Sequence, residues 1–194
     1  MTHKEGFKTV GSFWGNSSVR SRKILTILVF FLLSIVITVA GVLTPLTLED
    51  SKAMDDELKQ IQDDLKGMNV WQSTLYIFTN NFKISLLMFI PIAGPFIGSY
   101  ILYNTGLVIG AESRVMNMPG LIVFVALFLL PHAWLEFAAY SMAFAASVWL
   151  TWQVIKRQAK REILQTCKYI AICALLLFVA GFIEAYLIAS FSQA

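Results

Sequence analysis

The sequence contains few charged residues and little cysteine or histidine. Only 14% of its 194 residues are Asp, Glu, Lys or Arg, whereas roughly a quarter are charged in ordinary soluble proteins. Hydrophobic residues make up 57%, and the mean hydropathy is +0.69. The uncharged stretches 24–48 and 84–111 each exceed the ~20 residues that an α-helix needs to cross hydrocarbon. The composition therefore excludes a water-soluble globular enzyme and predicts an all-α, polytopic membrane protein.

The motifs of common enzymes and metal sites are also missing. The two cysteines, Cys167 and Cys173, are too few for a disulfide framework and have no CxxC or Cys/His metal spacing. The sequence has no HExxH, GxxxxGK[ST] or GxSxG that would supply a metal, a phosphate grip or a nucleophile. We therefore expect a non-enzymatic protein with no catalytic residues, no metal, no cofactor and no nucleic-acid partner.

Residues 1–23 form a basic tail that is too polar to be a secretory signal. Phe7, Val10, Phe13 and Trp14 allow a short amphipathic helix on the membrane surface, but a flexible tail fits the sequence equally well. The apolar stretch that follows predicts a first transmembrane helix over 24–44.

An acidic segment follows at 45–72, where seven acidic residues stand against three lysines. Met54, Leu58, Ile61 and Leu65 recur at helical spacing, which predicts an amphipathic helix over 49–66. This helix could rest its apolar stripe on its own bundle, or it could dock a partner or a second copy of the chain.

The basic residues predict the orientation, because Lys and Arg near membrane ends stay in the cytoplasm. The tail 1–23 and the basic loop 156–168 are then cytoplasmic, and the acidic segment lies outside. This arrangement needs a multi-pass protein of the cytoplasmic membrane with a cytoplasmic N-terminus. We predict five spans, at 24–44, 74–94, 96–112, 120–152 and 168–190, with the last four in a membrane core over 73–190. One alternative keeps 84–111 as a single tilted span and folds 120–152 into a hairpin at Pro131.

Prolines, glycines and polar residues interrupt the predicted core. Pro131 cannot continue a helix, so we expect a break or a new first turn there. Small residues at four-residue spacing allow close helix packing. The residues expected to pack or break helices are Pro91, Gly94, Pro95, Gly98, Gly106, Gly110 and Pro131.

Glu136 and Glu184 lie within predicted spans, and His132 is one helical turn before Glu136. Ionisable groups at depth are costly unless they are paired, so they mark either a structural pair or a pathway. We expect at least one of the two carboxyl groups to be protonated and His132 to be able to bond to one of them. The predicted intramembrane polar cluster comprises His132, Glu136, Glu184, Asn80, Asn81, Lys83 and Asn104, and the sequence does not choose a partner for Glu184.

Four motifs together resemble the stage II sporulation protein M family. They are NNF at 80–82, NxGxxxG at 104–110, LLPHxxxE at 129–136 and IEA at 183–185, and they span about residues 75–190. The resemblance implies a polytopic membrane protein. The member that names the family is a membrane scaffold that assembles with peptidoglycan-degrading partners during engulfment of the forespore.

Two non-enzymatic functions follow from these features. The first is a membrane scaffold or complex subunit that holds protein partners, or a second copy of the chain in a homo-oligomer, through the acidic helix 49–66 or the basic loop 156–168. The second is a transporter or channel-like permease in which His132, Glu136 and Glu184 line a polar path.

Overall fold

The computed structural model describes residues 18–191, which form seven α-helices and no strand. The predicted all-α fold is therefore confirmed. The helices are α2 (Val19–Val42), α3 (Leu48–Lys66), α4 (Val70–Met88), α5 (Ala93–Val115), α6 (Gly120–Phe128), α7 (Pro131–Ile155) and α8 (Ala159–Phe191). The possible amphipathic helix of Phe7 to Trp14 lies outside the described residues.

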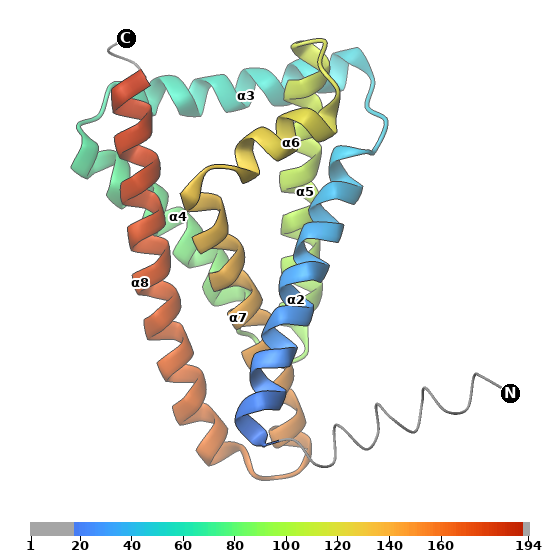
Figure 1. Cartoon of the computed structure of the whole chain (residues 1–194), viewed down its shortest axis with the longest axis vertical. Helices are drawn as coiled ribbons and strands as arrows, with labels where there is room; N and C mark the ends of the chain where they lie inside the picture. Colours follow the sequence, from blue (N-terminus) through green and yellow to red (C-terminus); the bar gives the residue numbers. More distant parts are fainter. Residues whose placement is uncertain (1–17, 192–194) are drawn as a thin grey trace, which may run out of the picture.

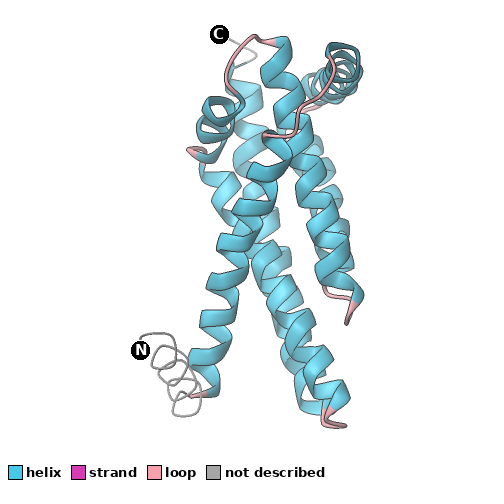
Figure 2. Ribbon diagram, turned by 90° about the vertical axis from the view of Figure 1, so that its right-hand side faces the viewer, coloured by secondary structure: helices cyan, strands magenta, loops and turns pink. Residues whose placement is uncertain are grey.

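The long helices run roughly along one axis, and α3 lies across one end of them (Figure 1). Figure 2 shows the bundle after a quarter turn, with α3 nearly end-on beside its top. The start of α2 and the connection from α7 to α8 lie together at the opposite end. The described part of the basic tail, with Arg20, Arg22 and Lys23, thus lies at the same end of the molecule as the basic loop 156–168, and the acidic helix lies at the other end.

Three helices are long and apolar enough to cross a membrane: α2, α7 and the part of α8 from Glu162 to Phe191. A fourth candidate is the pair α5 and α6, which bends by 119° at the break between them. This count covers residues 18–191 only, and the five-span arrangement stays a prediction. The alternative with one helix through 84–111 is wrong, because α4 ends at Met88 and α5 begins at Ala93.

The break expected at Pro131 is confirmed. Pro131 lies in the first turn of α7, where a missing N–H costs no helical hydrogen bond. The indole Nε1 of Trp134 donates to the carbonyl of Phe128 at 2.8 Å, so a carbonyl at the end of α6 is satisfied within the protein. In Figure 1, α6 leads obliquely into α7 rather than folding back beside it as a hairpin.

The prolines at the connection between α4 and α5 also stand where no helical hydrogen bond is lost. Pro91 lies in the connection between α4 and α5, and Pro95 falls in the first turn of α5. Ile92, between them, has φ 66°, and its N–H donates to Thr151 Oγ1 of α7 at 2.9 Å. This bond ties the α4–α5 turn to α7.

The acidic helix forms as expected, with Thr47 as its N-cap and ion pairs from Lys59 to Asp55 and from Lys66 to Asp63. The hydrogen bond to Asp55 raises the pKa of Lys59 above its ordinary value. The predicted stripe lies mostly on the packed face, since Leu65 is buried and Met54 and Leu58 are half-buried, but Ile61 is 44% exposed. Ser51 and Asp55, which are not part of the stripe, are buried as well.

A close contact joins α2 to α5 through glycine residues. A Cβ atom on Gly106 would lie 2.0 Å from the carbonyl oxygen of Thr38, and one on Gly41 would lie 2.1 Å from that of Tyr103. A Cβ on Gly110 would meet the carbonyl oxygen of Val42 at 2.9 Å. The backbones can approach this far only because these positions lack side chains.

The other predicted glycine pair faces different neighbours. A Cβ on Gly98 would overlap the ring of Phe144 on α7, and one on Gly94 would overlap the carbonyl of Met88 in the preceding turn. Gly98 therefore admits an aromatic ring between α5 and α7, and Gly94 permits the tight α4–α5 connection.

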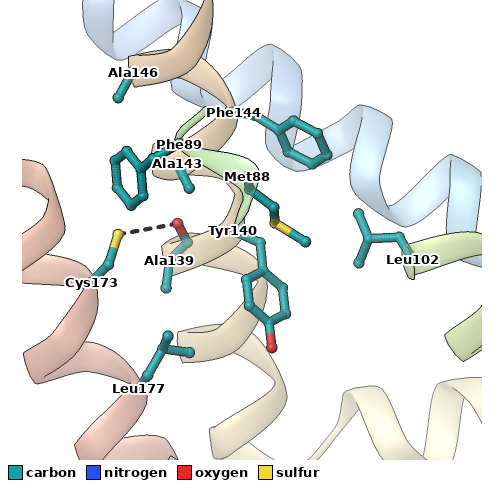
Figure 3. Packing of buried hydrophobic residues seen from close by; sticks show 10 residues of the cluster. All are labelled: Met88, Phe89, Leu102, Ala139, Tyr140, Ala143, Phe144, Ala146, Cys173 and Leu177. Atoms are coloured by element: carbon teal, nitrogen blue, oxygen red, sulfur yellow. Dashed lines mark hydrogen bonds between the residues drawn. The ribbon is translucent and has the colours of Figure 1, made fainter. Parts of the chain in front are cut away.

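The core lies where α4, α5, α7 and α8 meet (Figure 3). Three alanines of α7 are at most 1% exposed, so neighbouring helices contact this seam closely. Cys173 Sγ of α8 donates to the carbonyl of Ala139 at 3.2 Å. The buried residues of this core are Met88, Phe89, Leu102, Ala139, Tyr140, Ala143, Phe144, Ala146, Cys173 and Leu177.

Candidate functional site

The candidate site joins polar side chains from three helices beside this core. Asn81 belongs to α4, Glu136 to α7 and Glu184 to α8. Asn81 Nδ2 donates to Glu136 Oε1 at 2.6 Å, linking positions 55 residues apart. Glu136 also interacts electrostatically with Glu184. All three residues are half-buried.

Small residues bring these helices together. Ala139, the third residue after Glu136, is fully buried, and Gly181 and Ala185 of α8 are buried on either side of Glu184. A Cβ on Gly181 would lie 3.2 Å from the carbonyl oxygen of Thr74, so α8 passes close to the backbone of α4. Glu136 and Glu184 therefore lie beside the small residues at which α4, α7 and α8 pack, as expected for Glu136 from the spacing of small residues that follow it.

Tyr140 is a further member that sequence analysis missed. It lies one helical turn after Glu136, is 7% exposed and interacts electrostatically with both Glu136 and Glu184. Figure 3 shows its hydroxyl group pointing away from Met88 and Phe144. The four-residue spacing from Glu136 was the available signal, but an aromatic residue at that spacing is more often plain core.

His132 is half-buried at the start of α7, one turn before Glu136. Its Nδ1 is buried and has no hydrogen-bond partner among residues 18–191. The expected bond from His132 to a carboxyl group is therefore absent at Nδ1, although His132 shares a side of α7 with Glu136.

The remaining predicted polar residues make no bond to Glu136 in the described part of the chain. Asn80 is exposed, and its Nδ2 donates to Asn81 Oδ1 at the long distance of 3.4 Å. Lys83 is exposed on α4. Asn104 donates to the carbonyl of Tyr100 one turn earlier in α5, at 2.7 Å. The structure thus reduces the predicted cluster to Asn81, Glu136 and Glu184, with His132 at its edge.

This arrangement can do two kinds of work. Hydrogen bonds between helices fix their rotation and register in an apolar environment. Two carboxyl groups with an amide and a phenol could instead pass a proton or a small cation. Within residues 18–191 no group of three or more His, Cys, Asp or Glu residues could hold a metal ion.

The family described as stage II sporulation protein M matches residues 27–187, which is most of the chain. No curated protein and no solved structure matches the chain.

Proposed function

Because the chain belongs to the stage II sporulation protein M family, a family of membrane proteins, we propose that it is a membrane scaffold or complex subunit without enzymatic activity. It would cross the cytoplasmic membrane several times, with its N-terminus in the cytoplasm. Its acidic helix α3 would bind a protein partner on the outer face. The scaffold part of this proposal rests on the resemblance described above and on the position of α3.

The exposed acidic face of α3 is the observation that carries the proposal. The helix is anchored through Ser51, Asp55 and Leu65, and it packs against α5 and α8. Its opposite face is free within the described structure and carries the exposed acidic residues Glu49, Asp50, Asp56, Glu57, Asp63 and Asp64. A fixed row of carboxylates favours a partner with a basic surface and gives it a defined orientation.

Crosslinking in cells tests the scaffold. A photoreactive amino acid replaces Glu57 on the exposed face, or Ser51 on the buried face as the matched control. We expect protein adducts at Glu57 alone, and their loss when Asp56 and Asp64 are changed to Lys. These exposed changes should leave the thermostability of the bundle nearly unchanged. Adducts that survive the charge reversal, or that form equally at Ser51, would contradict the proposed surface.

The orientation is tested separately by cysteine labelling. In a chain with Cys167 and Cys173 replaced, a cysteine introduced at Asp56 should react with an impermeant maleimide in intact cells. A cysteine at Arg157 should react only after the membrane is permeabilised, because basic flanks remain in the cytoplasm. Labelling of Arg157→Cys alone in intact cells would reverse the topology.

The polar site supports a second candidate function, a transporter or channel-like permease. The observation in its favour is that two carboxyl groups from different helices, Glu136 and Glu184, lie near enough for their negative charges to repel each other, and that Asn81 donates to Glu136. The double variant Glu136→Gln with Glu184→Gln keeps shape and hydrogen bonding but removes both titratable groups. A transporter would show proton or ion flux in proteoliposomes that this variant abolishes while it still folds. A scaffold would show no such flux, and flux that persists unchanged in the variant rejects the polar path.

A further inference from the structure

A groove of about 830 Å³ lies at the basic end of the bundle, between α2, α5 and α7. Its walls are mostly apolar and include Phe96, Trp149 and Ile155. Phe96 and Ile155 are 75% and 68% exposed, so the groove opens sideways, toward lipid in a membrane. The hydrogen bond from Ile92 to Thr151 holds the α4–α5 turn against α7 and so fixes one side of the groove.

Two cationic side chains line this apolar groove. Arg22 lines it from α2, and its Nε is buried without a hydrogen-bond partner among the described residues. Lys156 lines it from the end of α7, with Nζ 4.7 Å from the centre of the Trp152 ring. Neither Asp nor Glu is among the described residues that line the groove. The groove therefore offers positive charge with no acid of its own to neutralise it.

The two threonine hydroxyl groups and the Trp149 indole of this groove already have partners. Thr26 Oγ1 donates to the carbonyl of Arg22 and lies 3.3 Å from Trp149 Nε1, which donates to it. Thr151 Oγ1 donates to the carbonyl of Ser147 and accepts the Ile92 N–H. The charged side chains that line this groove, Arg22 and Lys156, are both cationic, which favours an anionic ligand.

We propose that this groove binds one phospholipid with an anionic headgroup. The phosphate would contact Arg22 and Lys156, and an acyl chain would lie along Phe96, Trp149 and Ile155. An apolar wall that ends in two cations and two tryptophans matches the change from acyl chain to headgroup in one leaflet. Arg suits the phosphate because its planar guanidinium can form paired hydrogen bonds. This site is separate from the Asn81–Glu136–Glu184 site and independent of the scaffold function.

The test compares phosphatidylglycerol and phosphatidylcholine of identical acyl chains, titrated into the detergent-purified full chain and detected by native mass spectrometry. We expect one retained phosphatidylglycerol and clearly weaker phosphatidylcholine binding. Changing Arg22 or Lys156 to Gln should weaken phosphatidylglycerol about fivefold, and changing both should weaken it about thirtyfold, as for loss of one or two cations at an anionic surface. Arg22→Lys with Lys156→Arg should restore most of the affinity.

The matched control is Arg114→Gln, which removes an exposed cation from the opposite end of the molecule. It should leave the affinity unchanged, and inorganic phosphate should not compete. Equal binding of both lipids, equal loss in Arg114→Gln, or competition by free phosphate would overturn the proposal. So would anionic lipid binding that arises only after residues 1–17 are deleted, because that segment would then be the natural occupant.

Discussion

Replacing Gly106 by Ala should loosen the contact between α2 and α5. The new Cβ would lie 2.0 Å from the Thr38 carbonyl oxygen and 2.9 Å from Gly41 Cα, and ordinary contacts begin near 3.4 Å. Both neighbours are backbone atoms, so no side chain can rotate away. The two helices must instead separate locally by about 1.4 Å, the difference between 3.4 and 2.0 Å.

Overpacking of this kind costs about 1–3 kcal/mol. For a chain of this size, that corresponds to a fall of roughly 2–12 °C in the unfolding temperature. Gly110→Ala should have a smaller effect, because its nearest atom would be the Val42 carbonyl oxygen at 2.9 Å. Gly67→Ala should have almost none, since its nearest neighbour would lie at 3.4 Å and its φ of −74° suits alanine.

The assay heats each variant in detergent and measures the fraction that remains monodisperse on size-exclusion chromatography. The expected order of destabilisation is Gly106 first, Gly110 second and Gly67 last. If Gly67→Ala lowers the midpoint as much as Gly106→Ala does, the loss of stability does not depend on the distance between two backbones, and the close contact between α2 and α5 is not its cause.

Two further pairs of residues give predictions in the same thermostability assay. Asn81→Leu should destabilise the bundle by about 1–3 kcal/mol, because it leaves Glu136 without its interhelix donor. The control Asn80→Leu, at an exposed position, should not destabilise it. Equal losses in the two variants would show that the Asn81–Glu136 hydrogen bond does not stabilise the bundle. Lys23 and Glu162 form a 2.5 Å ion pair, and their side chains are only 13% and 7% exposed. Lys23→Met or Glu162→Gln alone should each lower the free energy of unfolding by about 3–5 kcal/mol, and the double variant should lose less than the sum of the two. Additive losses in this double-mutant cycle would show that the two side chains do not stabilise the fold as a pair.

The helix break at Pro131 and the acidic helix at 49–66 could be predicted because their causes are local. A proline removes an N–H from the helix wherever it occurs, and side chains three and four residues apart meet on any α-helix. The buried face of α3 could be predicted only in part, because Leu65 is buried and Met54 and Leu58 are half-buried but Ile61 is exposed. An apolar residue beside a membrane can be exposed to lipid without cost, so Ile61 need not face the protein.

The contacts of the candidate site were unpredictable for a different reason. Asn81 was one of several polar residues available to the buried acids, and a single sequence does not record which helices become neighbours. The role of Gly41 was missed likewise, although Ser34, Thr38 and Gly41 recur at spacings of four and three. In this protein small residues mark the interior more reliably than large apolar ones: Ser34 and Thr38 are fully buried, whereas Leu32 is 64% exposed.

The Lys23–Glu162 pair also has a consequence for biogenesis. Lys23 belongs to the first helix of the described chain, and its carboxylate partner is synthesised 139 residues later. The contact between Gly41 and Gly106 can form once α5 has emerged from the ribosome, but Lys23 stays unpaired until α8 begins. The early helices can therefore assemble as a partial bundle with an open side. When Glu162 has been synthesised, its ion pair with Lys23 joins the last helix, α8, to the first described helix, α2.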